Sequence, residues 1–188
     1  MKVLVFAASL RKASLNRKLA ALTASLLERD PSLQIDHADY RDFEMPPYDG
    51  DLEETSGLPS GSREFINRIQ QAGALVISTP EYNGSIPGTL KNALDWASRA
   101  KPNPLDKKPV LLLGASPGAL GAVRGLWHTR VPLEALGAFV YPQMHGLSKA
   151  HEAFDDAGQL RDSKAAEQLM KLLQTFVQFA NATNSTGK

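Results

Sequence analysis

Short runs of apolar residues place the strongest constraint on the fold of this chain. They lie at residues 3–8, 74–79, 110–113 and 138–141, with a weaker candidate at residues 33–38. The four stronger runs are almost continuously apolar, whereas a strand with one solvent-exposed face would alternate between apolar and polar residues. The runs therefore predict strands that are covered on both faces, as in a parallel β-sheet.

Helical patterns separate these predicted strands. Leucines at helical spacing predict a first helix over residues 15–26, which the Asp30-Pro31 pair would end. Further helices are predicted around residues 65–69, 90–97, 123–136 and 169–176. Strands that alternate with helices form βαβ units, so we expect residues 1–188 to form one α/β domain with a doubly wound, five-stranded parallel sheet and helices on both faces. The last residues, 181–188, are expected to be a disordered tail.

Composition excludes several classes of protein. The chain has 188 residues, of which 43% are hydrophobic, and its 21 Lys and Arg residues nearly balance its 20 Asp and Glu residues. A sizeable core is therefore expected, without a net field that would attract nucleic acid or an anionic membrane. Cysteine is absent, and the four histidines include no close helical pair with a carboxylate partner, so neither disulfides nor a metal site are expected. The apolar start is too short for a signal peptide and no segment has the length of a membrane span, which predicts a soluble cytoplasmic protein.

Ligands of doubly wound sheets bind beyond the carboxyl ends of the strands, which directs attention to the loops after the first, third and fourth strands. The first of these loops contains Ser9, Arg11, Ser14 and Asn16. Hydroxyl, amide and guanidinium donors beside the start of a helix are typical of a phosphate site. In the alternative interpretation, Ser14 only caps the helix and Arg11 is solvated. Neither G-x-G-x-x-G nor G-x-x-x-x-G-K-[ST] occurs here, which argues against a Rossmann-type dinucleotide site and against an NTPase.

The loop after the third strand, STPEYNGSIPG, has features that a flavin site requires. Asn83 and Gly84 permit positive φ, and Ser85 would start the next helix. Such a loop can present consecutive backbone N–H groups to the edge of a flat heterocycle, with Tyr82 lining the pocket. In the alternative interpretation, these residues form a plain Asn-Gly turn.

The loop after the fourth strand, LLLGASPGALGAVRG, contains four glycines that allow the backbone to approach a ligand closely. Its GASPG segment also matches the G-x-S-x-G pattern of serine hydrolases, with Ser116 as the nucleophile. Glu134 and then His145 or His151 follow in the chain order of a hydrolase triad. Pro117 argues against this function, because the residue after the nucleophile must donate an N–H to the oxyanion and proline has none.

The three loops resemble those of the NAD(P)H-dependent FMN reductases in the flavodoxin-like superfamily, a group that includes bacterial quinone, chromate and azo-dye reductases. The resemblance rests on SLRKASLN after the first strand, PEYNGSIPGTLKNALDW after the third and SPGALGAVR after the fourth. It extends over nearly the whole chain, from residue 3 to about residue 173. It implies a flavodoxin-like sheet of strand order 2-1-3-4-5 and a non-covalently bound FMN.

The resemblance also implies which residues bind the cofactor. The implied FMN ligands are Ser9, Arg11, Ser14 and Asn16 at the phosphate, Pro80, Glu81, Tyr82, Asn83, Gly84 and Ser85 along the isoalloxazine ring, and Ser116 and Gly118 on its other side. The chain departs from the family pattern at Ala8 and Ala13, where glycine is frequent, which would lower the affinity for FMN without removing a donor. Members of the family are usually dimers or tetramers with the flavin near a subunit interface, so a homodimer or homotetramer is expected.

The function that follows is that of an FMN-dependent NAD(P)H oxidoreductase. NAD(P)H would give a hydride to the flavin N5, and a quinone or another small acceptor would then take the electrons in a ping-pong cycle. The flavin carries the chemistry, so no catalytic side chain is expected. Two alternatives from other classes are an electron carrier of the flavodoxin type without NAD(P)H activity and a serine hydrolase that uses Ser116. The choice between NADH and NADPH stays open.

Overall fold

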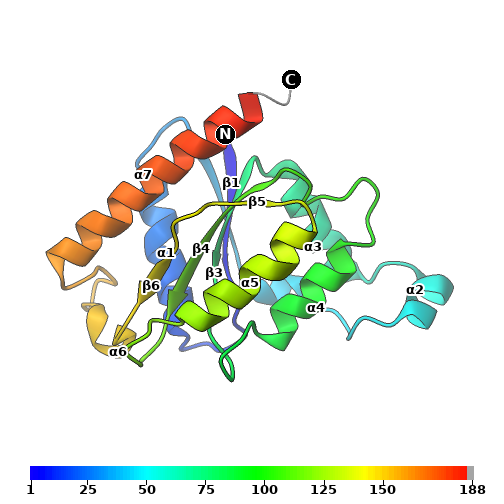
Figure 1. Cartoon of the computed structure of the whole chain (residues 1–188), viewed down its shortest axis with the longest axis horizontal. Coiled ribbons are helices and arrows are strands. Elements are labelled where there is room, and N and C mark those ends of the chain that lie inside the picture. The colour runs from blue at the N-terminus through cyan, green and yellow to red at the C-terminus, as the bar shows by residue number, and fades with distance from the viewer. Residues whose placement is uncertain (186–188) are drawn as a thin grey trace.

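Six parallel strands form one sheet in the computed structural model, which describes residues 1–185 (Figure 1). The strands are β1 (Lys2–Ala7), β2 (Gln34–Ala38), β3 (Ala74–Ser78), β4 (Pro109–Ala115), β5 (Phe139–Val140) and β6 (His145–Leu147). Their order is β2-β1-β3-β4-β5, and β6 pairs with the carboxyl-terminal part of β4. This is the strand order of the flavodoxin-like fold, so the predicted fold class and strand order are confirmed.

Alternate residues of each central strand point to opposite faces of the sheet, where two hydrophobic clusters bury them. In β1, Leu4 and Phe6 belong to one cluster, whereas Val3 and Val5 belong to the other. None of these four side chains is more than 1% exposed. Because both faces are covered, such a strand needs an apolar residue at every position, which explains the continuous apolar runs in the sequence.

Helices cover both faces of the sheet, with α1 and α7 on one side and α3, α4 and α5 on the other (Figure 1). The helices are α1 (Leu15–Leu27), α2 (Gly50–Ser56), α3 (Ser60–Gln71), α4 (Gly88–Ala97), α5 (Val123–Ala135), α6 (Ala150–Ala153) and α7 (Ser163–Ser185), with a short 3-10 helix at Tyr40–Phe43. Leu19 and Phe176 pack on the first face, and Phe65, Leu94 and Leu126 on the second. Within residues 1–185, no helix combines the length and the apolar character needed to cross a bilayer.

The sheet has a sixth strand, β6, where the sequence predicts five strands. Its sequence, His-Gly-Leu, contains a single apolar side chain and therefore has no recognisable strand pattern. The strand forms because β4 continues to Ala115, beyond its predicted end at residue 113. The additional residues of β4 offer backbone groups with which His145–Leu147 pair in parallel.

The carboxyl-terminal tail expected from residue 181 is wrong for its first part, because α7 continues to Ser185. A side-chain contact explains the longer helix. Asn184 Nδ2 donates to the carbonyl oxygen of Gly73 over 3.0 Å and so ties the last turn to the segment before β3. Residues 186–188 lie outside the described residues.

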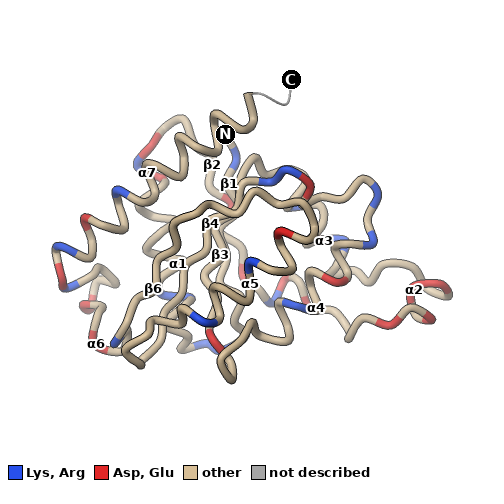
Figure 2. The backbone as a smooth tube through the Cα atoms, in the orientation of Figure 1, with Lys and Arg blue, Asp and Glu red and all other residues tan. Residues whose placement is uncertain are grey.

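The segment before α3 extends from the body as an arm, with α2 at its tip (Figure 1). Figure 2 shows acidic residues gathered on α2, while basic and acidic residues are interspersed over most of the backbone. Trp96 of α4 holds the base of the arm: its Nε1 donates to the Pro46 carbonyl over 2.9 Å, and its ring lies edge-on to Tyr48 with 5.0 Å between the centroids. Arg99, just after α4, donates through Nε to Glu53 over 2.8 Å, so that the arm is also attached to the segment that follows α4.

Candidate flavin site

The loops after β1, β3 and β4 lie side by side at one edge of the sheet, because these parallel strands are neighbours. Asn16, in the first turn of α1, connects them. Its Nδ2 donates to the Ala115 carbonyl over 2.9 Å, while its Oδ1 accepts from the Ala115 N–H (2.9 Å) and from Ser78 Oγ (3.0 Å). Asn16 is only 2% exposed. The amide expected at the flavin phosphate thus joins the first loop to the ends of β3 and β4, and a direct contact with phosphate stays a prediction.

The start of α1 presents donors that the described part of the chain does not use. Ser14 occupies the N-cap position with φ −73° and ψ 130°, yet its side chain makes no capping hydrogen bond. Ser9, in the same loop, is likewise buried. The guanidinium of Arg11 is exposed and has no hydrogen bond or ion pair with residues 1–185. Ser14 therefore occupies the predicted cap position without a capping hydrogen bond, and Arg11 is solvated, as the alternative interpretation expects. The first N–H groups of α1 are available to an anion.

Residues 82–85 form a tight hairpin turn in the second loop. The N–H of Tyr82 donates to the Ser85 carbonyl and the N–H of Ser85 to the Tyr82 carbonyl, both over 3.0 Å. Asn83 and Gly84 have φ values of 53° and 75°, as a type I′ turn requires of its two central residues. The predicted positive φ at both positions is confirmed. The turn leaves Tyr82 45% exposed, so its ring is accessible to a ligand.

Glu81 fixes the second loop to helix α5, a role that the sequence analysis missed. Its Oε2 accepts from the N–H groups of Arg124 (3.1 Å) and Gly125 (3.2 Å), and its Oε1 accepts from Arg124 Nε (2.7 Å). Burial alone would raise the pKa of Glu81, but the hydrogen bonds outweigh burial and hold the pKa below its ordinary value. The N-cap residue of α5, Ala122, has no side-chain acceptor of its own. A predicted helix without a capping residue at its start is the signal that points to such a distant cap.

Helix α5 also touches the second loop directly. A Cβ atom on Gly125 would lie 3.0 Å from the Cα and Cβ atoms of Glu81 and 3.3 Å from the Pro80 carbonyl oxygen, so any side chain there would push the loop and the helix apart by a few tenths of an ångström. One turn further along α5, His128 Nδ1 lies 2.9 Å from Ser85 Oγ. The helix therefore holds the loop near both of its ends, and the predicted ring-binding residues 80–85 are brought together.

The third loop is held by the segment around β6 and α6. The N–H of Ser116 donates to the Leu147 carbonyl over 3.1 Å, and the Gly118 carbonyl accepts from the N–H of Lys149 over 3.1 Å. Gly118 is exposed and Ser116 is partly exposed. Both residues therefore remain accessible at the same edge of the sheet as the first two loops.

The surroundings of Ser116 do not form a hydrolase triad. Across residues 1–185, the Ser116 hydroxyl has a single, long hydrogen bond, 3.5 Å to the carbonyl of Gly118. His145 Nε2 is buried without a partner, and His151 pairs with its neighbouring glutamate. Glu134 pairs with a cation on its own helix. Since no base contacts the hydroxyl, the geometry gives the hydrolase function no support.

The residues of the three loops fit FMN. The first loop offers hydroxyl, guanidinium and helix N-terminal donors to a phosphate monoester, as the donor pattern in the sequence predicts. The second loop offers a rigid turn and an exposed aromatic ring to a flat heterocycle. In the part of the chain that the structure describes, no group of three or more His, Asp or Glu residues is arranged to hold a metal ion.

The sequence model of the NADPH-dependent FMN reductases matches residues 1–152, a range that contains all three loops. The chain belongs to the NADPH-dependent FMN reductase family. An NAD(P)H-dependent FMN reductase from Pseudomonas aeruginosa is 39% identical over 181 residues, which cover 93% of this chain and 92% of that protein. A quinone reductase from Escherichia coli is 34% identical over 185 residues, which cover 95% of each chain.

A solved structure of a flavoenzyme has the same fold over nearly its whole length. It is FerB, a flavoenzyme NAD(P)H:(acceptor) oxidoreductase from Paracoccus denitrificans, with a TM-score of 0.83 and 31% sequence identity. The match covers 97% of this chain and 98% of that one. The likeness to this flavoenzyme therefore extends over the whole fold and not only over the three loops.

Proposed function

We propose that this FMN reductase family member passes electrons from NAD(P)H through bound FMN to a quinone or another small acceptor. The observation that carries the proposal is the meeting, at one edge of the sheet, of an uncapped helix start, an exposed arginine and the rigid turn at residues 82–85. The relatives at 39% and 34% identity, named as an FMN reductase and a quinone reductase, support the same activity.

The phosphate of FMN would bind at the first loop. Ser9 and Ser14 would donate through their hydroxyls, and Arg11 would donate two parallel hydrogen bonds. The first N–H groups of α1 add the positive end of the helix dipole. Asn16 contributes to this site by fixing the position of the first loop through its hydrogen bonds to the end of β4.

The isoalloxazine ring would lie between residues 80–85 and the third loop, with Ser116 and Gly118 on its other side. When bound, FMN supplies a ring that accepts a hydride and passes the electrons on. The protein orients the ring: α5 holds Glu81 and Ser85, so the backbone N–H groups of the turn keep fixed positions. In this proposal no side chain acts as a nucleophile, acid or base.

An electron carrier of the flavodoxin type is the second candidate from the sequence. Membership of a reductase family favours the enzyme over the carrier. Steady-state NAD(P)H oxidation with menadione as the acceptor separates the two functions, because a carrier without a site for NAD(P)H does not turn it over.

We further propose a homodimer or homotetramer whose interface includes α5. Trp127 and Val131 on this helix are 55% and 67% exposed, and Leu120 just before it is 57% exposed. Large apolar side chains grouped on a surface mark interaction sites. Because α5 also holds the second loop, a subunit bound here would lie beside the flavin. Sedimentation velocity measures the oligomeric state. We also propose a cytoplasmic location, which agrees with the proposed use of NAD(P)H.

The first experiment is an absorption spectrum of the purified protein, before and after addition of FMN and then of NADPH under anaerobic conditions. A protein-bound flavin spectrum that bleaches with NADPH is expected, because the bound ring then takes up the hydride. A protein that neither binds FMN nor changes the flavin spectrum contradicts the proposed function. A protein that binds FMN but leaves it oxidised in excess NADPH and NADH supports the electron carrier instead.

A further inference from the structure

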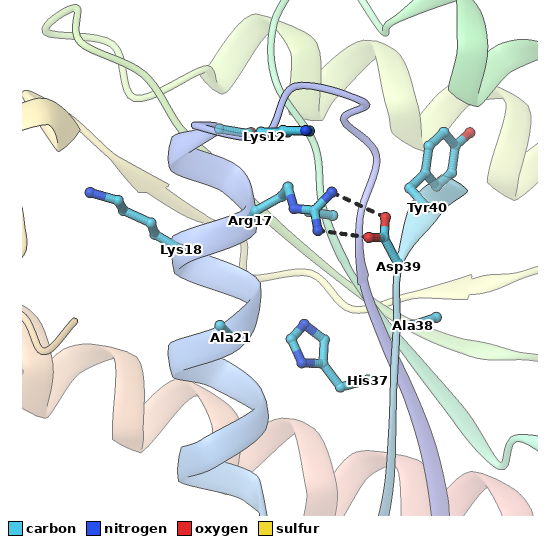
Figure 3. Close-up of a pocket in the computed structure, with 10 residues that line it drawn as sticks. Lys12, Arg17, Lys18, Ala21, His37, Ala38, Asp39 and Tyr40 are labelled. Atoms are coloured by element: carbon cyan, nitrogen blue, oxygen red, sulfur yellow. Dashed lines mark hydrogen bonds and ion pairs between the residues drawn. The ribbon is translucent and has the colours of Figure 1, made fainter. Parts of the chain in front are cut away.

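A cavity of about 390 Å³ lies between the first turns of α1 and the carboxyl end of β2 (Figure 3). Its polar lining includes Lys12, Ser14, Arg17, His37 and Asp39. Only Ser14 among these residues belongs to the predicted phosphate ligands of FMN, so the cavity adjoins the first loop without coinciding with the flavin site. Its volume lies within the range of about 300–1,000 Å³ that is typical of small-molecule sites.

Arg17 and Asp39 face each other in this cavity (Figure 3). Arg17 Nη1 and Nη2 donate to the two carboxylate oxygens of Asp39 over 3.1 and 2.7 Å. The hydrogen bonds from Arg17 and from the backbone N–H of Arg41 lower the pKa of Asp39, so its carboxylate is charged at neutral pH. A guanidinium has five N–H donors, which leaves three of those on Arg17 for a ligand.

The other polar groups of the cavity favour an anion. Lys12 adds a positive charge to the balanced Arg17–Asp39 pair, whereas the ammonium of Lys18 points away from the pair and lies over the Phe154 ring, 6.0 Å from its centroid (Figure 3). His37 adds none at neutral pH, because its partial burial lowers its pKa. An anionic group with several acceptor oxygens would satisfy these donors.

A phosphorylated ribose combines the two chemistries that this cavity presents. In doubly wound folds that bind dinucleotides, an acidic residue after the second strand accepts from the ribose 2′-hydroxyl of NAD, whereas an arginine nearby binds the 2′-phosphate of NADP. The first loop of this chain lacks the glycine fingerprint of those folds, so only this position after the second strand is compared. Here the arginine pairs with the carboxylate and balances its charge, so that Lys12 leaves the group with a net positive charge. Asp39 directly follows β2, and Arg17 of α1 contacts it. Figure 3 shows Lys12 above this pair, at the start of α1. A carboxylate for a hydroxyl and two cations for a phosphate are therefore present together.

We propose that this cavity binds the 2′-phosphorylated ribose of NADPH, with Lys12 and Arg17 on the phosphate and Asp39 on a ribose hydroxyl. The identity of the ligand rests on the proposed function, and the inference adds a preference for NADPH over NADH. NADH has a hydroxyl in place of the phosphate and would leave Lys12 without its partner.

Steady-state kinetics with menadione as the acceptor test this preference. Lys12→Ala removes one phosphate contact at an exposed loop position and is expected to raise the KM for NADPH about 10-fold, with the KM for NADH unchanged. Lys171→Ala removes the same charge from an exposed position on α7 and is the matched control. A Lys12→Ala enzyme that keeps the wild-type ratio of the two KM values contradicts the inference.

Binding without turnover is measured by NMR of the His37 ring in the FMN-loaded protein. The chain has four histidines, and His37→Gln identifies the signal. Adenosine 2′,5′-bisphosphate is expected to shift this signal with a Kd about 10-fold lower than that of adenosine 5′-monophosphate or of inorganic phosphate. A bisphosphate that leaves the His37 signal unchanged overturns the site. Inorganic phosphate that binds as tightly as the bisphosphate overturns the assignment to ribose.

Failure of the inference can be distinguished from failure of the proposed function. If the enzyme oxidises NADPH but adenosine 2′,5′-bisphosphate does not shift its His37 signal, only the inference is contradicted. A protein that takes up no FMN contradicts the proposed function, and the same NMR titration of the flavin-free protein then decides whether the cavity binds a phosphorylated ribose.

Discussion

The carboxylate of Glu81 accepts a hydrogen bond from the guanidinium of Arg124, 43 residues later in the chain, over 2.7 Å. The same carboxylate accepts from two backbone N–H groups at the start of α5. A residue of the second loop is thus the cap of a helix from a different βα unit. The proposed flavin loop and α5 therefore form one rigid unit.

Removing the charge of Glu81 should destabilise the protein in a pH-dependent way. Glu81→Gln is expected to lower the free energy of unfolding by about 1 kcal/mol at pH 7, because a neutral side chain caps a helix less strongly. The pKa of Glu81 in the folded protein lies below its ordinary value of 4.5, so its contribution is present above about pH 4.5 and is lost as the pH falls through the lower, folded pKa. Urea unfolding at pH 7 and at successively lower pH measures the difference.

The control for this substitution is Glu54→Gln, which removes the same charge from an exposed position on α2. It should leave the free energy of unfolding within about 0.5 kcal/mol of the wild-type value. A difference between wild-type and Glu81→Gln that stays constant down to the most acidic pH would show that the cap does not depend on the charge.

Gly125→Ala should separate the second loop from α5. The added Cβ would lie 3.0 Å from backbone and side-chain atoms of Glu81, so the loop and the helix must separate by a few tenths of an ångström, at a cost of about 1–3 kcal/mol in the free energy of unfolding. Gly88→Ala is the matched control, because a Cβ there meets no atom within 4 Å and the substitution should stabilise α4 by about 0.5 kcal/mol. Equal effects of the two substitutions in thermal or urea unfolding would argue against the close contact.

Asn16→Ala should destabilise the protein even without FMN. It deletes three buried hydrogen bonds and leaves the Ala115 backbone and the Ser78 hydroxyl unsatisfied, which costs about 3 kcal/mol. Asn181→Ala, at an exposed position on α7, should change the free energy of unfolding by no more than about 0.5 kcal/mol. If flavin-free Asn16→Ala has the same free energy of unfolding as the wild type, then the amide contributes to ligand binding and not to the stability of the fold.

Arg11→Ala should weaken FMN binding without destabilising the flavin-free protein. Loss of a bidentate, charged contact to the phosphate is expected to cost about 2–3 kcal/mol of binding free energy. Arg29→Ala removes an exposed arginine beyond the other end of α1 and should leave the Kd for FMN unchanged. Fluorescence titration with FMN gives both values, and equal Kd values for the two variants would refute the phosphate assignment.

The central strands could be predicted because burial on both faces leaves a simple pattern. Leu4 and Val5 point to opposite clusters, yet both must be apolar, so the run in β1 is continuous. The strand β6 has no such pattern, because its pairing depends on how far β4 extends and not on its own residues. The turn at Asn83 and Gly84 was predictable for a local reason, since both residue types tolerate positive φ.

Contacts between distant segments were not predictable from local pattern. The sequence places Asn16 in the phosphate motif, but it does not reveal that its side-chain amide forms hydrogen bonds with the backbone of Ala115. It places Glu81 in the second loop without indicating that the carboxylate caps α5. In each case the partner is far along the chain, and only the assembled sheet brings the two together.

The hydrogen bonds of Asn16 to Ala115 close a separation of 99 residues, and this has a consequence for the order of events during synthesis. The amino-terminal strand and α1 leave the ribosome first, but the backbone that holds Asn16 is made only when β4 is translated. A nascent chain that ends before β4 therefore lacks the hydrogen bonds that fix the first loop. If FMN binds as proposed, capture of its phosphate group should accordingly follow the docking of β4 and should not occur on the first strand and α1 alone.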